Sequence, residues 1–437
     1  MATLVTRFQS GDSGAPIMTG QVGALTDVLS HCLIIGRVFT TTNDAAFTNN
    51  TTEARLNGGT AFLLFLTPAT TDRAYFGHSS RFTRLTFAFG TPGTSATYVW
   101  EYWNGSAWTT LAVTDGTSSF TAAGSVTWTS PGSWATTAVN SVTQYWVRVR
   151  YTGSAPATNP LVNSVSYLGW LEYFSGTNQR DYRAAVGRQL YLSVNDNTVG
   201  AGGAKEARAS GFETMSALGV GTGQFPTTTQ VSTLLTWRKS VTADATARTW
   251  LCMADDRAFY LAILTGDAAG RYYEATFQDL YALLSSDAYG VLITGRETEN
   301  DANSQNLGLL VTALGVTSVG HYMPRSYTGV GTSIRVGKHG DYVKGGSSVS
   351  LSGNVPYLNG PDGIAYTSPV WVHESGLHLR GRLRGLRMWL HALTALNDLD
   401  TFSGTGTLAA KTFLYAKTLS DVASAAVLET SDAWETN

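Results

Sequence analysis

Hydrophobic and polar positions alternate with a period of two in many short segments, which is the pattern of a pleated β-strand. In "YVWEYW" (98–103), Trp100 falls on one face of the predicted strand, and Glu101 and Trp103 fall on the other. The Asn-Gly that follows favours a tight hairpin turn, after which Trp108 begins a return strand. The loop is either Asn-Gly or Asn-Gly-Ser-Ala, and this choice decides which tryptophans face each other.

The charge of Glu101 assigns the two faces of this strand. A carboxylate is rarely buried without a partner, so the face of Glu101 is expected to be the wetter one. Trp100 is then predicted to be in the core, together with Leu111 if the loop has four residues. Trp103 and Trp108 are predicted to be partly exposed near the hairpin tip, where a neighbouring subunit or a sugar can contact them.

The same alternation recurs in a tryptophan-rich block from about residue 55 to 168, in "TAFLLFL", "RLTFAFG", "SVTWTS" and "QYWVRVRYTG". Six of the twelve tryptophans lie between Trp100 and Trp146. Several short strands at this spacing favour an antiparallel β-sandwich. The polar, Thr/Asn-rich stretch from Thr40 to Thr52 is interpreted as a linker in front of this block.

Beyond Trp170 the pattern indicates further strands. "DYRAAVGRQLYLSVND" predicts two strands joined at Val186-Gly187, "ARTWLCMADDRAFYLAIL" predicts a hairpin that turns at 254–257, and "YGVLITGRE" predicts a buried strand. Helix is scarce. One helix is expected near the start, where Thr19 can cap it and apolar residues recur up to Cys32; "TFQDLYALLSSD" (276–287) and "SQNLGLLVTALGV" (304–316) are ambiguous candidates.

These elements predict a mainly β fold with few short helices. Residues 1–45 are too few to form a core of their own, so they are expected to complete a β-rich body with residues 169–437. Residues 55–168 are then an antiparallel β-sandwich inserted into this discontinuous body.

Composition narrows the classes of function. Only 14% of the residues are charged and the formal net charge is −2, so no global field attracts nucleic acid or an anionic membrane. Of the 29 basic residues 23 are Arg and 6 are Lys, a bias that is typical of subunit interfaces. No apolar run approaches the ~20 residues that span a bilayer, and no signal peptide is recognised at the start.

The two cysteines, Cys32 and Cys252, lie in apolar surroundings and are expected to be buried free thiols. They provide neither a disulfide framework nor the spacing of a zinc site. No cofactor is expected.

Four motifs resemble catalytic or binding signatures. "GDSGAP" resembles the nucleophile segment of chymotrypsin-like proteases, but the ten residues before Gly11 contain neither the His nor the Asp that such an enzyme needs earlier in the chain. "HESGLH", from His373 to His378, is one residue longer than the zincin motif and fits a strand and turn better than a helix. "VGAGGAKEAR" resembles a dinucleotide-binding loop but lacks the surrounding βαβ unit. The pair Asp255/Asp256 resembles the acid pair of a glycosidase but lies at a predicted turn, where Asp is common for backbone reasons. We therefore expect no catalytic residue and no metal site.

A stripe of arginines in "HLRGRLRGLRMWLH" is the other candidate surface. In an extended segment, alternation places Arg380, Arg382 and Arg384 on one face. We interpret the stripe as solvated or facing another subunit, with binding of a phosphate-bearing polymer as the alternative.

Several strings together resemble a family of virion structural proteins of tailed bacteriophages. They are "SGAPIMTGQVGALTDVL", "GWLEYFSGTNQRDYRA", "AKEARASGFET", "RKSVTADATARTWLCMADDRAFYLAIL", "GRETEN" and "TFSGTGTLAAKTFLYAK". The resemblance covers residues 1–38 and 169–437. The intervening block, with "WEYWNGSAW" and "YWVRVR", resembles an aromatic-rich β-domain found in assorted phage particle proteins.

The resemblance implies a non-enzymatic structural component of a tailed phage particle, located in the virion and most consistent with the tail or baseplate. The expected partners are other phage structural proteins and further copies of this chain. Two alternatives remain: a capsid decoration protein, and a host-recognition adhesin whose Trp-rich domain binds surface polysaccharide. Trp103, Trp108, Arg380, Arg382 and Arg384 are the candidate interaction residues.

Overall fold

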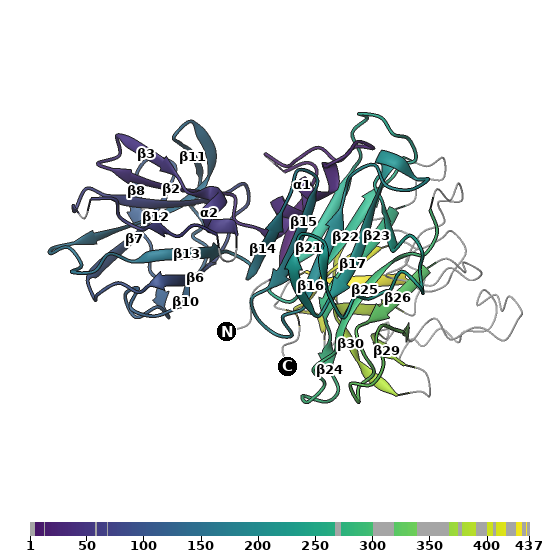
Figure 1. The fold of residues 1–437 in the computed structure, drawn as a ribbon. Helices are drawn as coiled ribbons and strands as arrows, with labels where there is room; N and C mark the ends of the chain where they lie inside the picture. Colours follow the sequence, from purple (N-terminus) through teal and green to yellow (C-terminus); the bar gives the residue numbers. More distant parts are fainter. Residues whose placement is uncertain are drawn as a thin grey trace, which may run out of the picture. The chain divides into compact units, whose positions relative to one another are not determined.

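The computed structural model describes residues 5–12, 14–56, 59–67, 69–266, 272–299, 319–338, 367–374, 378–389, 400–404, 408–416, 425–430 and 434. Within these residues the chain is mainly β, with antiparallel sheets and two short α-helices, as the alternation predicts (Figure 1). It divides into two compact units. The sandwich unit comprises Phe8–Pro16 and Thr26–Val186, and the body unit comprises Met1–Arg7, Ile17–Leu25 and Gly187–Asn437.

The sandwich unit is built of two antiparallel sheets. The larger sheet consists of β2 (Arg37–Thr42), β3 (Ala46–Asn49), β5 (Arg73–His78), β7 (Thr97–Trp103), β8 (Trp108–Thr110), β11 (Thr136–Val139) and β12 (Val142–Thr152). The smaller sheet consists of β4 (Phe62–Leu63), β6 (Arg84–Thr91), β9 (Thr114–Asp115), β10 (Gly124–Thr127) and β13 (Leu161–Ser166). The helix α2 (Thr51–Arg55) and the hairpin of β14 (Trp170–Ser175) and β15 (Gln179–Ala184) complete the unit.

Aromatic side chains fill the space between these two sheets. Trp100 of β7 is 4% exposed, and its ring centroid lies 6.1 Å from that of Phe76 in the larger sheet. It also lies 6.2 Å from Phe87 in the smaller sheet and 6.4 Å from Trp128. The prediction that Trp100 belongs to the core is therefore confirmed.

The register of the hairpin settles the length of its loop. Trp103 pairs with Trp108, so the loop has four residues, Asn104–Ala107. The side chain of Asn104 accepts hydrogen bonds from the backbone N–H groups of residues 106 and 107, at 2.9 and 2.8 Å, and Gly105 adopts φ +100°. Leu111 is buried, as expected for a loop of this length, and Trp103 and Trp108 are both partly exposed.

The outer face of β7 is drier than predicted, because Glu101 is only 7% exposed. Its carboxylate pairs with two arginines of the neighbouring strand β12: Arg148 Nε lies 2.7 Å from Oε2, and Arg150 Nη2 lies 3.3 Å from Oε1. The Arg148 guanidinium also stacks over the Trp108 ring, 4.2 Å from its centroid. A carboxylate with two such partners can be buried, so its charge did not identify the solvent face.

The polar stretch from Thr40 to Thr52 is not a linker. It contains the end of β2, all of β3 and the start of α2, and β2 pairs with both β3 and β5. Thr40 lies in the interior, where its hydroxyl accepts a hydrogen bond from the Asn50 amide at 2.7 Å. The compact unit therefore takes in more of the chain than the predicted block 55–168; the insertion of that block into a discontinuous body stays a prediction.

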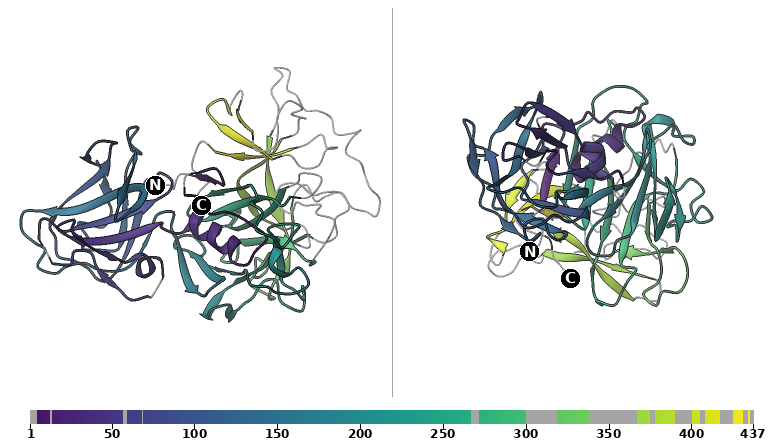
Figure 2. Two further views of the ribbon diagram at one scale, coloured as in Figure 1. Left: turned by 90° about the horizontal axis from the view of Figure 1, so that it is seen from above. Right: turned by 60° about the vertical axis from the view of Figure 1, so that its left-hand side comes forward.

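The body unit also contains two larger sheets. The strands that the body unit contributes to the first sheet include β16 (Tyr191–Asn195), β17 (Glu206–Phe212), β20 (Leu235–Arg238), β21 (Trp250–Ala254), β22 (Ala258–Leu264), β23 (Tyr272–Asp279), β25 (Val291–Arg296), β26 (Val319–Met323) and β27 (Ile334–Arg335). The second consists of β24 (Tyr281–Ala282), β28 (Gly337–Lys338), β29 (Thr367–His373), β30 (Leu379–Trp389), β31 (Thr401–Ser403), β32 (Thr412–Ala416) and β33 (Ala425–Glu429), coloured green to yellow in Figures 1 and 2. The described residues also form a small hairpin of β18 (Thr214–Ala217) and β19 (Val220–Thr222), the 3-10 turn Gly203–Lys205, and the strand β1 (Thr6–Gln9).

One apolar core joins the two body sheets. Met253 and Tyr260 of the first sheet belong to the same buried cluster as Leu383 and Leu386 of β30, and Trp434 closes over Tyr260 at 5.3 Å between ring centroids. The Tyr260 hydroxyl donates a 2.8 Å hydrogen bond to the backbone carbonyl of Arg384. The predicted hairpin at 254–257 and the predicted strand in "YGVLITGRE" are both present, as β21–β22 and β25.

The helix predictions had mixed outcomes. The helix α1 (Ala24–Leu33) lies where the apolar spacing predicts one, but Thr19 does not cap it. The cap is the buried carboxylate of Asp196, which accepts a 2.7 Å hydrogen bond from the Leu25 N–H. Residues 276–287 are not a helix: Thr276 and Phe277 belong to β23 and pair with Tyr260 and Phe259. The candidate 304–316 lies outside the described residues.

Both cysteines are buried free thiols, as predicted. In the part of the chain that the structure describes, the helices are too short and too polar to cross a membrane.

Candidate interaction surface

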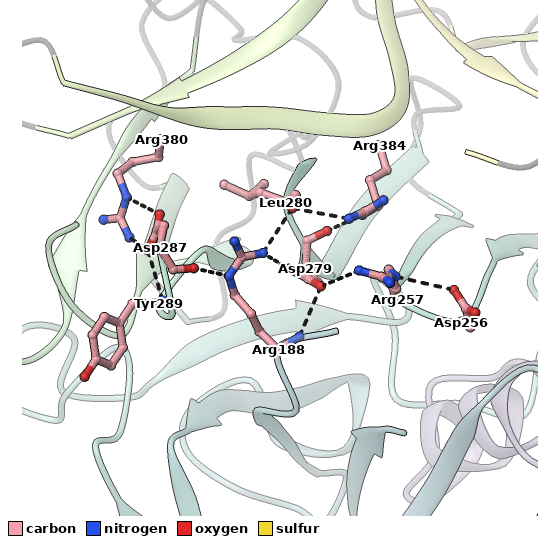
Figure 3. A network of polar contacts seen from close by, with 9 residues as sticks. All are labelled: Arg188, Asp256, Arg257, Asp279, Leu280, Asp287, Tyr289, Arg380 and Arg384. Carbon is pink, nitrogen blue, oxygen red and sulfur yellow. Dashed lines mark hydrogen bonds and ion pairs between the residues drawn. The ribbon is translucent and has the colours of Figure 1, made fainter. Parts of the chain in front are cut away.

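The side chain of Arg380, near the start of β30, lies inside the body unit and is 1% exposed. Its Nε and Nη2 atoms each lie 2.8 Å from a carboxylate oxygen of Asp287, which is the bidentate geometry of a strong ion pair (Figure 3). Its third nitrogen, Nη1, lies 2.8 Å from Oε2 of Glu374. Two carboxylates therefore compensate one buried guanidinium.

This arginine joins three segments that are far apart in the sequence. Its Nη1 donates to the backbone carbonyl of Arg325 at 2.9 Å, and its own carbonyl accepts from the Leu283 N–H at 3.0 Å. The Tyr327 N–H donates to the same Glu374 oxygen at 3.3 Å. Polar contacts thus hold together residues 281–287, residues 325–330, and Glu374 with residues 378–380.

The same three segments present apolar side chains to solvent. We call this set the Leu379 surface; its members and their exposed fractions are Leu283 54%, Leu284 52%, Tyr327 42%, Val330 71% and Leu379 47%. These are five of the nine exposed large hydrophobic residues in the described part of the chain. A gathering of exposed apolar side chains on a fixed base is typical of a protein–protein contact site.

Polar and aromatic groups surround the Leu379 surface. The ring of exposed His378 lies 5.1 Å from the Tyr327 ring, and the Arg325 guanidinium stacks over Tyr289 at 5.4 Å from its centroid. Arg325 also pairs with Glu213, whose Oε1 lies 2.6 Å from its Nε. An apolar centre with Arg, Tyr and His at the edge is the usual composition of an interface.

A second buried arginine, Arg384, supports this region from below. It is fully buried and donates to the backbone carbonyls of Asp279 and Leu280 (Figure 3). Burial lowers the pKa of its guanidinium, and the charge of Asp279 opposes that shift. Asp279 itself pairs with Arg188 and Arg257. The network therefore fixes the 279–287 segment that carries Leu283 and Leu284.

The structure contradicts the interpretation of the arginine stripe as solvated or facing another subunit. Arg380 and Arg384 are buried, and Arg382 is half-buried with its guanidinium 4.4 Å from the centroid of the Tyr281 ring. Arg380 and Arg384 both donate to groups in 279–287, 93 and 105 residues earlier in the chain, and Arg380 also donates to Glu374 and to the Arg325 carbonyl. Sequence alone cannot pair them, so the arginines lie beneath the candidate surface rather than on it.

The tryptophan pair lies on the sandwich unit, at the tip of the β7–β8 hairpin. The Trp103 and Trp108 rings pack edge to face at 5.8 Å between centroids, and both side chains stay partly exposed. Trp108 is also held by Arg148 and by the Tyr75 ring at 5.5 Å. Trp103 is therefore the less constrained of the two.

Residues of the remaining motifs form turn and backbone contacts where the structure describes them. Glu374 and His378 close the turn between β29 and β30, with a 3.0 Å bond from the Glu374 N–H to the His378 carbonyl. Asp255 accepts backbone bonds at the β21–β22 turn; burial raises the pKa of its carboxyl to about 7, with a further contribution from Asp256. Ser13 lies outside the described residues, which contain no group of three or more His, Cys, Asp or Glu side chains placed to hold a metal ion.

The Leu379 surface was not predicted from the sequence. Leu283 and Leu284 lie in 276–287, which was only an ambiguous helix candidate, and the spacing of Tyr327, Val330 and Leu379 shows no relation between them. The one sequence feature near this surface was the arginine stripe. It identified strand β30, which carries Leu379, but the exposure expected for its arginines was wrong. Comparison of the sequence with protein-family models and with curated proteins finds no match.

Proposed function

We propose that this chain is a non-enzymatic structural component of a tailed phage particle, part of the tail or baseplate, that works through contacts with further copies of itself and with neighbouring subunits. The observation that carries the proposal is the Leu379 surface: exposed apolar side chains on a base fixed by ion pairs. The resemblance of sequence segments in 1–38 and 169–437 to phage virion proteins is the reason for proposing that the assembly is a phage particle. A capsid decoration protein is the close variant of this proposal.

The rigidity of the base supports assembly as the role of this surface. Ordering mobile side chains on association has an entropic cost, and a preformed surface reduces it. Here three segments are already held by the Arg380 guanidinium before any partner binds. The low charge of the chain and its preference for Arg over Lys agree with repeated subunit contacts.

A second candidate function, glycan binding by the sandwich unit, is favoured by one observation. Trp103 is partly exposed at a hairpin tip, where an aromatic face can stack on a sugar ring. In this alternative the chain is a host-recognition adhesin and its partner is surface polysaccharide. The two candidates use different units, so variants can separate them.

Sedimentation velocity of the purified chain over a range of concentrations tests the assembly role. Val330→Asp places a charge at the most exposed position of the Leu379 surface and is expected to weaken self-association at least tenfold. Val220→Asp is the matched control, because Val220 is 55% exposed in the same unit but belongs to the β18–β19 hairpin. Equal self-association of both variants and the parent, or a chain that stays monomeric throughout, contradicts self-assembly through this surface.

A further inference from the structure

The sandwich unit contains a polar cavity of about 390 Å³ that plays no part in the proposed assembly. Its lining is dominated by charged and polar side chains, among them Arg37, Arg55, Arg180, Glu172 and Gln144. Cavities of a few hundred Å³ are the usual size of small-molecule sites.

One arginine of this cavity is held in place by backbone carbonyls. Arg55, at the end of α2, donates from Nε to the Ile35 carbonyl at 2.8 Å and from Nη2 to the Gly36 carbonyl at 2.7 Å. Burial lowers the pKa of this guanidinium; the charge of Glu172 opposes the shift, and the charge of Arg37 adds to it. A fixed, desolvated positive charge beside further arginines favours the binding of an anion.

The charges that line the cavity leave one positive charge uncompensated. Three arginines face two carboxylates, Glu172 and Asp27, and Glu172 is already engaged by Ser30 at 2.9 Å and by Arg180 at 3.5 Å. The cavity's two histidines, His31 and His78, add no charge at neutral pH, because burial lowers their pKa values to about 4 and about 3.

Arg37 is the group that remains to meet a ligand. Its side chain is exposed, and its guanidinium forms no ion pair or hydrogen bond with any residue in the described part of the chain. Gln144 indicates that the ligand carries hydroxyl groups. Its Oε1 atom is buried and has no hydrogen-bond donor among the described residues. A buried acceptor without a donor is costly, and a ligand hydroxyl would satisfy it.

We propose that this cavity binds a small polyhydroxylated monocarboxylate, such as a sugar acid. The single negative charge matches the net charge of the lining and pairs with Arg37. The hydroxyl groups donate to Gln144 Oε1 and to the carboxylates. A phosphate, with about two negative charges, matches this balance less well, and a neutral sugar leaves Arg37 unpaired.

Isothermal titration calorimetry of the full chain with glucuronate tests this proposal, with glucose and inorganic phosphate as comparison probes. We expect saturable one-to-one binding of glucuronate and at least tenfold weaker binding of glucose and of phosphate. Arg37→Ala is expected to weaken glucuronate binding at least tenfold without lowering the melting temperature, because the side chain is exposed. Arg150→Ala, which removes a partly exposed arginine of β12 that does not line the cavity, is expected to bind like the parent chain.

A glucuronate-containing tetrasaccharide distinguishes the two sources of the ligand. Tighter binding than glucuronate identifies a glycan, and weaker binding identifies the free acid. The proposal is overturned if glucuronate binds no better than glucose or phosphate, or if Arg37→Ala binds it as the parent does. The proposal does not depend on the Leu379 surface, because no residue of that surface lines the cavity.

Discussion

Trp100 and Trp103 are three residues apart on one strand, yet only Trp100 lies between the two sheets of the sandwich unit. The period of two assigns these opposite faces correctly. The period does not predict the solvent exposure of the outer face. That exposure depends on Arg148 and Arg150, which pair with Glu101 from a strand almost fifty residues away in the sequence. At the scale of a residue, the sequence therefore predicts the face but not the partners.

Replacing these tryptophans separates their roles. Trp100→Ala is expected to lower the free energy of unfolding by about 3–5 kcal/mol, since it leaves a cavity in a packed core. Trp108→Ala loses the stacking on Arg148, a contact of roughly 0.5–2 kcal/mol, and Trp103→Ala should cost less. Hydrogen exchange of the β7 and β12 peptides in the full chain measures all three, and an equal loss of protection would contradict the two-face assignment.

A buried histidine should make the sandwich unit sensitive to acid. His78 Nδ1 accepts from the Ser80 N–H at 3.0 Å and Nε2 donates to the His31 carbonyl at 2.8 Å, so the neutral ring satisfies both contacts. Burial, assisted by the charge of His31, lowers its pKa to about 3. The unfolded chain, with a pKa near 6.5, binds the proton more readily, so this contribution to stability is complete above pH ~6.5 and is lost as the pH falls towards 3.

The measurable consequence is the slope of stability against pH. Each such histidine contributes up to about 1.4 kcal/mol per pH unit over this window. The variant His78→Gln should be less stable at pH 7 and should lose less stability than the parent between pH 6.5 and 4. Denaturant titrations at several pH values test this, and parallel profiles for the two proteins would show that His78 does not titrate as proposed.

At the scale of an element, hairpins were predictable and helix ends were not. The β7–β8 and β21–β22 hairpins depend on contiguous sequence, so alternation and turn residues identify them. The start of α1 depends on Asp196, which lies 171 residues after Leu25. In 276–287 the apolar spacing suits a helix, but pairing with β22 decides in favour of a strand.

The cap of α1 is a sharp test of this long-range control. Asp196 accepts from the Leu25 N–H and also pairs with the buried Lys239. Asp196→Ala leaves that lysine without its carboxylate and is expected to cost about 3–5 kcal/mol. Thr19→Ala removes the residue that the sequence suggested as the cap and should cost less than about 0.5 kcal/mol. Chemical denaturation compares the two, and a larger effect of Thr19→Ala would contradict the assignment of the cap.

At the scale of the whole molecule, the change of composition identified a distinct tryptophan-rich region but misplaced where its compact unit begins and ends. Polar Thr and Asn residues in β2 and β3 suggested a linker, although they pair with β5. The candidate surface was still harder to find, because it needs three segments brought together by Arg380. Ion pairs between distant segments leave no periodic signal in a single sequence.

The central claim is that the chain is a structural subunit of a phage particle. Electron microscopy of purified particles labelled with Fab fragments raised against the chain tests it most directly. We predict several labels per particle, at symmetry-related positions on the tail or baseplate. Particles that carry no label while the free chain binds the Fab fragments would contradict the claim.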